Sequence, residues 1–151
     1  MKAVMLSIRP EWCKKIADGK KTIEVRKSKP KLKTPFRSYI YQTLPKCGDW
    51  NERDGRVIGE FVCNYIYEDA HGEYADVFID HALLDLESQK EYGGGKMLYG
   101  WHISELKIYD KPKALSEFLV EDNRTFDCPQ LVTMKRAPQS WCYVEGVLDN
   151  G

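Results

Sequence analysis

The sequence predicts an α+β fold, a small mixed β-barrel of about six strands with short flanking helices. The length of 151 residues indicates one domain, which we expect to span residues 1–151. Hydrophobic residues make up 42% of the chain and charged residues 30%, as is typical of a globular protein that can bury a core. Strand-like stretches outnumber helical ones and the two kinds are interleaved, which favours this fold over a doubly wound sheet.

Six stretches have the composition or the alternation of strands. They are residues 3–8, 22–27, 36–43, 56–69, 98–110 and 140–147. In TIEVRK, residues 22–27, apolar and polar residues alternate along the whole stretch. We therefore expect Ile23 and Val25 to face the core. Glu24 and Arg26 then share the opposite face of the strand.

Two stretches have helical spacing. Pro10 suits the first position of a helix, because its missing N–H would be unpaired there anyway, and Asp18-Gly19 supplies an end. We expect this helix to span residues 10–18. Leucines and a tyrosine mark a second helix over residues 80–92, which Gly93-Gly94-Gly95 ends. The remaining stretches are rich in Pro, Gly and polar residues and are expected to be loops or irregular: 28–35, 44–55 and 120–138.

The net charge of zero conceals an uneven distribution along the chain. Residues 1–56 carry 15 Lys and Arg against 6 Asp and Glu, a net of +9, and the remaining residues carry 8 against 17, a net of −9. Such asymmetry can mark an anionic partner. The alternative is that the two halves intermix in the fold and neutralise each other.

Cysteine usage and hydropathy exclude several classes of protein. The five cysteines include no CxxC pair and no secretory signal precedes them, so we expect reduced thiols and a cytoplasmic location. No apolar run approaches the ~18 residues that a membrane helix requires, so we expect no membrane partner. The spacing of Cys128 and Cys142 fits no standard zinc pattern, and we expect neither a metal nor a cofactor.

The segment DGKKTIEVRK, residues 18–27, gathers four cations around one carboxylate, Glu24. Arg26 shares a strand face with Glu24, and Lys21 enters from the preceding turn. On a surface such a cluster is an ion pair that contributes roughly 0–1 kcal/mol. The alternative is a polar site built into the fold, since charged side chains are rarely buried unless they are paired.

The pattern Gly19-x-Lys21-x-x-Glu24-x-Arg26 resembles the G-x-K-x-x-E-x-R signature of ASCH domains, which belong to the PUA-like superfamily of β-barrels. LSIRPEWCKKIADG resembles the first strand and helix of that family, GKMLYGWHI its late strand and KIYDKPKALSEF the segment that follows. RAPQSWCYV resembles the closing strand of a bacterial and phage-associated subgroup. The resemblance implies a PUA-like barrel with a cleft beside the first helix, lined by Lys21, Glu24 and Arg26.

The resemblance also implies a function class. ASCH domains are generally inferred to bind RNA. One similar group removes the acetyl group from N4-acetylcytidine with a Thr nucleophile two positions before the motif Arg, where this chain has Glu24. Other members are described as ribonucleases that depend on Lys, Tyr and Ser, and Lys21, Tyr41 and Ser140 are the candidates here. An interaction module with a blocked cleft is a third possibility.

We expect the ligand to be RNA or a nucleotide or nucleoside. Lys21 and Arg26 supply charge for a phosphate, which Arg can bind bidentately. Glu24 either accepts from an exocyclic amine or a ribose hydroxyl, or holds the two cations in place. The candidates for the rest of the binding site are Arg9 at the mouth of the cleft and Tyr41 and Tyr99, on which a base would stack for about 1–3 kcal/mol.

In an enzyme, Lys21 and Glu24 would be the catalytic pair. A carboxylate beside Lys21 favours the charged amine, which argues against Lys21 as a base. An ammonium would still stabilise an oxyanion. Trp101 and Trp141 are large aromatics in predicted strands, and we expect them in the core rather than in a binding surface.

Overall fold

The computed structural model describes residues 1–124, 128 and 130–148. The strands are β1 (Ala3–Ile8), β2 (Ile23–Arg26), β3 (Phe36–Gln42), β4 (Arg56–Asp69), β5 (Leu98–Lys113), β6 (Phe118–Asp122), β7 (Gln130–Thr133), β8 (Trp141–Val144) and β9 (Gly146–Val147). The helices are α1 (Pro10–Ala17), α2 (Ala75–Ala82), α3 (Leu86–Gly93) and the short 3-10 helix η1 (Leu115–Glu117). None of the described helices is long and apolar enough to cross a membrane.

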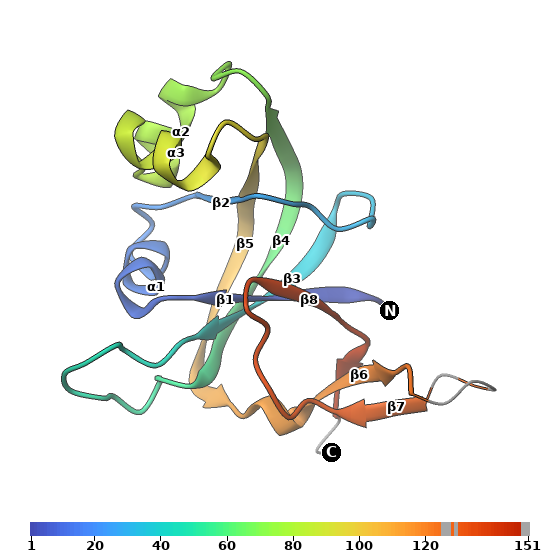
Figure 1. Ribbon diagram of the computed structural model, residues 1–151. Helices are drawn as coiled ribbons and strands as arrows, with labels where there is room; N and C mark the ends of the chain where they lie inside the picture. The colour runs from blue at the N-terminus through green and yellow to red at the C-terminus, as the bar shows by residue number, and fades with distance from the viewer. Residues whose placement is uncertain (125–127, 129, 149–151) are drawn as a thin grey trace.

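The main sheet has six strands in the order β2-β5-β4-β3-β1-β8, and a smaller sheet has three in the order β7-β6-β9. β1 and β3 are parallel, whereas the other pairs are antiparallel. The long strands β4 and β5 run from the α2–α3 hairpin at one end of the molecule to the small sheet at the other (Figure 1). Three register shifts interrupt their pairing. Bulges of this kind bend a sheet, which here curls into an open, barrel-like shape.

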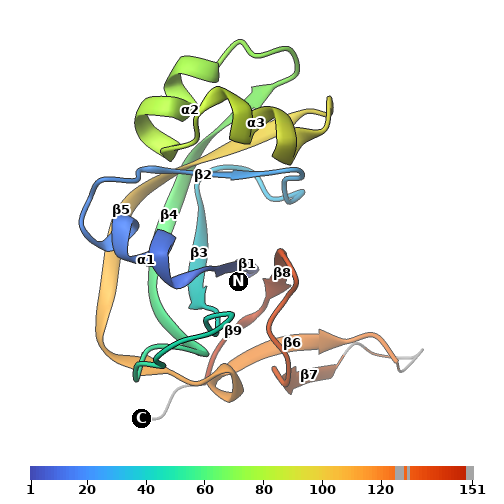
Figure 2. The ribbon, with the colours of Figure 1, turned by 60° about the vertical axis from the view of Figure 1, so that its left-hand side comes forward.

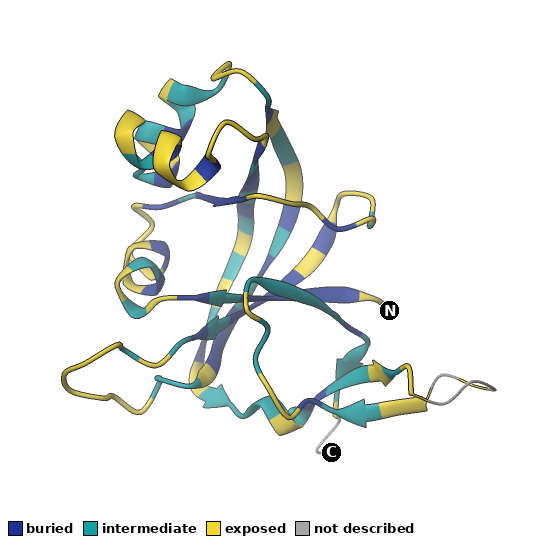
Figure 3. Ribbon diagram, in the orientation of Figure 1, coloured by how far each residue is buried: buried dark blue, intermediate teal, exposed yellow. Residues whose placement is uncertain are grey.

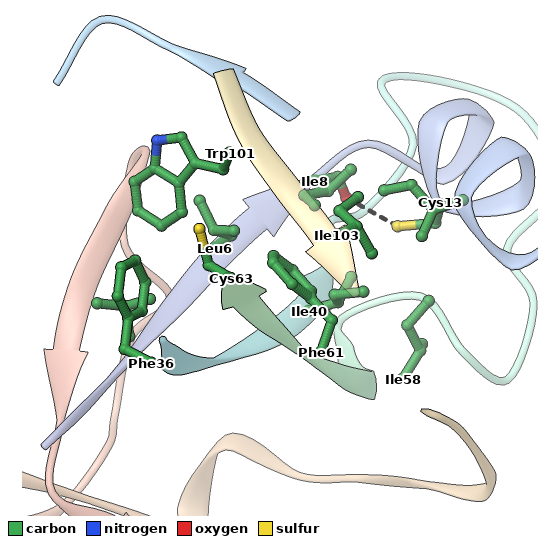
Figure 4. Packing of buried hydrophobic residues seen from close by; sticks show 12 residues of the cluster. Leu6, Ile8, Cys13, Phe36, Ile40, Ile58, Phe61, Cys63, Trp101 and Ile103 are labelled. Atoms are coloured by element: carbon green, nitrogen blue, oxygen red, sulfur yellow. Dashed lines mark hydrogen bonds between the residues drawn. The ribbon is translucent and has the colours of Figure 1, made fainter. Parts of the chain in front are cut away.

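The core lies inside the curl of the main sheet. β1 and β3 are mostly buried, whereas the buried residues of β4 and β5 gather in the first half of each strand (Figure 3). Leu6, Ile40, Phe61 and Trp101 belong to one cluster of fully buried side chains (Figure 4). Each contributes about 1.5–3 kcal/mol by leaving water. Trp101 makes edge-to-face contacts with Phe36 at 5.7 Å between ring centroids, so it is a core residue as expected.

A second cluster joins the two sheets, and a third lies under α2. Phe118 of the small sheet packs with Met5 and Val144 of the main sheet. Under α2, Phe78 packs on Ile23. Gly100 has no side chain at this point, and a Cβ there would lie 2.5 Å from the Phe78 ring. α2 therefore needs a glycine beneath it to sit on the sheet.

The helix predicted over residues 80–92 is wrong as a single element. The structure has two helices there, because the backbone turns left-handed at Leu83 (φ 59°) after α2. Asp85 then caps α3 by accepting a hydrogen bond from the Ser88 backbone N–H at 2.8 Å. The apolar spacing continues across this break, which is why the pattern alone suggested one helix.

The C-terminal third also contains more strand than predicted. The expectation of irregular structure over residues 120–138 is wrong in part, because β6 extends to Asp122 and β7 spans Gln130–Thr133. The single strand predicted over residues 140–147 divides at Glu145, whose N–H bonds the Leu119 carbonyl. The chain passes there from the main sheet to the small one.

The strand β2 has the predicted division of faces. Ile23 and Val25 lie in the cluster under α2. Glu24 and Arg26 also have only 8% of their surface exposed, although they are charged. Both faces of this strand are therefore covered, and the polar face requires partners inside the protein.

Candidate functional site: a cleft between α1 and α3

A cleft of about 610 Å³ opens over the polar face of β2. Its walls come from the end of β1, from α1, from α3 with the turn before it, and from the segment that precedes β8. Figure 2 shows β2 between α1 and the α2–α3 hairpin. The polar and aromatic residues of the lining are Ser7, Arg9, Trp12, Lys21, Glu24, Arg26, Lys27, Ser28, Ser88, Tyr92, Gln139 and Ser140.

Arg26 uses its whole guanidinium group inside the protein. Its Nε and Nη2 donate to Glu24 Oε1 at 3.2 and 3.0 Å. Nη2 also donates to the Ser7 carbonyl at 2.8 Å, and Nη1 donates to the carbonyl and the hydroxyl of Ser140, both at 3.1 Å. A guanidinium has five N–H donors, and these five bonds occupy all of them.

These bonds connect the two edges of the open main sheet. Arg26 ends β2 at one edge, and Ser140 directly precedes β8 at the other. A second link lies alongside, where Trp141 Nε1 donates to the Ser28 hydroxyl at 2.9 Å. The floor of the cleft is therefore also the place where side chains close the sheet into a barrel-like shape.

Glu24 has one engaged oxygen and one that makes no hydrogen bond. Oε1 accepts both bonds from Arg26. Oε2 is buried and has no hydrogen-bond partner among the described residues, and it lies 3.4 Å from the Nζ of Lys21. A buried carboxylate oxygen without a hydrogen bond is costly, so Oε2 keeps unused acceptor capacity at the floor of the cleft. It exposes almost no surface, and its nearest partner is the Nζ of Lys21, so a ligand reaches it only when the side chains that cover it move.

Lys21 is buried beside Glu24, with 3% of its surface exposed. Its Nζ donates to the Ala82 carbonyl at 2.8 Å and lies 4.7 Å from the centroid of the Trp12 ring. Burial lowers the pKa of Lys21 from its ordinary value, and the nearby Glu24 only partly opposes this effect. Glu24 favours the charged amine, in the expected direction, but desolvation is the larger effect and the net shift is downward.

Two aromatic rings in the cleft wall were not predicted. Trp12 comes from α1, and Tyr92 comes from α3 with the Nζ of Lys27 4.7 Å from its ring centroid. Burial raises the pKa of Tyr92, so its hydroxyl stays neutral. In the sequence both residues mark only the apolar face of a helix. Only the packing of the two helices around the cleft identifies them as part of its wall.

The predicted site residues divide into two groups. Arg9, Lys21, Glu24 and Arg26 all line the cleft. The other two lie elsewhere. Tyr41 packs against the cluster that joins the sheets, and Tyr99 packs against the main core, with the Nζ of Lys29 over its ring. Ser140, a candidate from the resemblance, does line the cleft. The described residues contain no group of three or more His, Cys, Asp or Glu side chains that would hold a metal ion.

Comparisons with known proteins identify the fold and the family of the chain. An ASCH protein from Zymomonas mobilis superposes with a TM-score of 0.61 at 19% identity, over 95% of this chain and 87% of that one. Its serine-to-alanine variant superposes with a TM-score of 0.67 at 22% identity, over 95% of this chain and 88% of that one. Its tyrosine-to-phenylalanine variant superposes with a TM-score of 0.63 at 19% identity, over 96% of this chain and 91% of that one. Likeness at this identity shows the fold. No curated protein matches the chain. The family model described as "ASCH domain" matches residues 6–112, and the chain therefore belongs to the ASCH domain family.

Proposed function

We propose that this ASCH domain binds RNA by taking one base with an exocyclic amine into the cleft, between Lys21 and Oε2 of Glu24. The family is associated with RNA binding. The observation that carries the proposal is the arrangement of Glu24, in which Arg26 occupies Oε1 while Oε2 stays without a hydrogen bond.

The arrangement argues against a phosphate on the floor of the cleft. Bidentate binding of a phosphate requires two free N–H groups on a guanidinium. All five N–H groups of Arg26 are already engaged with Glu24, Ser7 and Ser140. Glu24 would also repel an anion. Arg26 is therefore a positioning residue, and the ligand atoms at the floor are those of an uncharged group.

A base with an exocyclic amine would supply the hydrogen bond that Oε2 of Glu24 lacks. Cytosine N4 and adenine N6 each carry donor hydrogens that Glu24 Oε2 can accept. The ring nitrogen beside that amine accepts a hydrogen bond, and Lys21 Nζ lies 3.4 Å from Oε2 as the neighbouring donor. Uracil has a carbonyl oxygen in place of the amine, and this oxygen would face the carboxylate. Leaving the buried acceptor unpaired costs about 1–3 kcal/mol.

The aromatic walls suit a planar ligand. Trp12 and Tyr92 both line the cleft. Stacking of a base on such a ring contributes about 1–3 kcal/mol in proteins that bind single-stranded RNA. The mouth carries Arg9 and Lys27, both exposed, where the phosphates of the ligand would pass. A cytoplasmic location, where thiols stay reduced, is part of this proposal.

Calorimetric or NMR titration with free cytidine, adenosine and uridine tests the proposal. We expect cytidine or adenosine to bind at least tenfold more tightly than uridine, a difference of about 1.4 kcal/mol. In Glu24→Gln the side chain still accepts from Arg26 but presents an amide donor to the base, and the preference should fall or invert. Glu11→Gln, on the exposed side of α1, is the matched control. Equal affinity for uridine, or no binding of any nucleoside, would overturn the proposal.

A second candidate, hydrolysis of an N4-acylated cytidine or of RNA, is favoured by one observation, the lowered pKa of Lys21. A neutral amine takes a proton from water as the water adds to the acyl carbon. The C–N bond then breaks, the proton passes to the departing amine, and cytidine and a carboxylate are released. Turnover of N4-acetylcytidine, or cleavage of labelled single-stranded RNA, that disappears in Lys21→Ala would establish it. Inactivity on both substrates would rule out this second candidate, and binding would remain as the proposed function.

A further inference from the structure

A second cavity of about 510 Å³ lies on the other side of the chain segment that forms one wall of the cleft. We propose that it holds the neighbouring nucleotide of the same RNA strand, with the phosphate on Lys135 and Arg136. This inference rests on the proposed function, because it assumes that a base occupies the cleft.

The two cavities share a thin wall. Gln139 and Ser140 line the cleft, whereas Pro138 lines the second cavity. The lining residues Pro138 and Gln139 are consecutive, and the Cα atoms of consecutive residues are about 3.8 Å apart, so a single stretch of backbone forms the border between the two spaces. Successive nucleotides of one strand can therefore occupy both sides.

Hydrogen bonds hold this wall in place. The Ser7 hydroxyl donates to the Pro138 carbonyl at 2.6 Å. The Ser7 N–H donates to the Ser140 carbonyl at 3.0 Å, and Arg26 bonds the same carbonyl. Arg26, which positions Glu24 in the cleft, thus also positions the chain segment between the cleft and the second cavity.

The charges at the second cavity suit a phosphate. Lys135 and Arg136 are exposed and make no hydrogen bond or ion pair within the described part of the chain, although Lys135 is close enough to Asp122 to help lower the pKa of that carboxyl. The third cation of the lining, Lys2, is 3.4 Å from Glu145 and neutralises it. Glu121 is the remaining acid of the lining, so two available cations face one carboxylate.

The rest of the lining suits a base. Met134 is buried, and Val120 and Cys142 continue the apolar surface. Burial raises the pKa of Cys142 to about 11, so this thiol is uncharged. The Nζ of Lys2 lies 5.2 Å from the centroid of the Tyr143 ring. An apolar floor with cations at its rim is the arrangement by which single-stranded RNA is bound without a sequence requirement.

The test compares cytidine with the dinucleotides CpU and UpC. We expect one of the two dinucleotides to bind at least tenfold more tightly than cytidine, and its identity gives the direction of the strand. Its affinity should fall with salt at a slope of about −0.7 per phosphate contact, whereas that of cytidine should not. In Lys135→Ala/Arg136→Ala the tenfold gain and the salt dependence should both disappear, while cytidine binding stays within about twofold of wild type.

The matched control is Lys107→Ala/Lys111→Ala, which removes two exposed lysines of β5 outside both cavities. It should leave the dinucleotide affinity unchanged. If cytidine binds but both dinucleotides bind no better, or if the control loses as much affinity as Lys135→Ala/Arg136→Ala, the second nucleotide site is refuted and the cleft proposal stands. If none of the three ligands binds, both proposals fail.

Discussion

In the proposed site, Arg26 acts by positioning Glu24 and not by contacting the ligand. Its five donors are divided among Glu24, Ser7 and Ser140, which come from three separate parts of the chain. Lysine has three donors on a single nitrogen and cannot reproduce this planar arrangement. The arginine is therefore required by geometry, and the effect on binding is transmitted through Glu24.

Arg26→Ala should lower the free energy of unfolding by about 3–5 kcal/mol, because Glu24 is then left buried without its main partner. Arg37→Ala is the control, since Arg37 also pairs with a glutamate, Glu60, but has 54% of its side chain exposed. The loss there should stay below about 1 kcal/mol. Urea unfolding of both variants measures the difference. Equal losses would contradict the view that Arg26 organises the site.

Lys21 should change the pH dependence of stability. Its folded-state pKa is lowered from 10.5, so between the two values the unfolded chain binds more protons than the folded protein. The contribution of Lys21 to the free energy of unfolding should therefore rise with pH across that window, up to 10.5, while the buried thiols Cys13, Cys63 and Cys142, whose pKa values are raised, contribute in the opposite direction. Urea unfolding at several pH values should show that Lys21→Met lacks this rise, while exposed Lys31→Met keeps it. The same slope in wild type and Lys21→Met would contradict the assignment.

Among the elements, β5 is notable for the bulges that bend it against β4. At one of them Glu105 has a left-handed backbone, with φ 47°. The register there passes from Val62 opposite Ser104 to Glu60 opposite Lys107, so the β5 side contains one additional residue. Left-handed backbone is unfavourable for residues other than glycine. The curl of the sheet therefore includes a local conformational cost at Glu105.

Glu105→Gly should remove this cost and raise the free energy of unfolding by up to about 1 kcal/mol, after the greater entropy of glycine in the unfolded chain is deducted. Glu105→Ala removes the same side chain but keeps the Cβ, and it should give no gain. Thermal unfolding of the three proteins compares them directly. A similar gain in the alanine variant would attribute the effect to the loss of the carboxylate instead of the backbone.

The elements also show what local pattern can and cannot predict. The alternation of β2 predicted its two faces, because period-two spacing fixes side-chain direction within a strand. It did not predict that the polar face is covered, since Ser140 is supplied from 114 residues further along the chain. The signature identified Lys21, Glu24 and Arg26, whereas Tyr92 looked like any apolar helix residue. Only the packing of α3 over β2 brings it to the cleft.

On the scale of the whole molecule, the opposite charges of the two halves meet in the fold. Strands from the second half lie next to strands from the first in the order β2-β5-β4-β3-β1-β8. Three ion pairs join a cation of the first half to an acid of the second: Lys2–Glu145, Lys29–Glu68 and Arg37–Glu60. The halves therefore intermix, and the exposed cations that line the two proposed nucleotide sites are Arg9 and Lys27 at the cleft mouth and Lys135 and Arg136 at the second cavity.

The same intermixing predicts that the part matched by the family model does not fold alone. A chain of residues 1–112 lacks β8, the antiparallel partner of β1, and it lacks the Ser140 groups that bond Arg26. It also loses Phe118, Met134 and Val144 from the core, whose burial contributes about 5–9 kcal/mol together. This is comparable with the whole stability of a typical domain, about 5–15 kcal/mol.

We therefore expect the 1–112 chain to show no cooperative thermal unfolding and little amide dispersion in its NMR spectrum. The 1–148 chain keeps every strand of both sheets and should unfold as the full chain does. Cooperative unfolding of the shorter chain would mean that residues 113–148 are an appendage to a domain that is complete without them. The C-terminal wall of the cleft would then be able to detach, and Arg26 would need other partners to position Glu24.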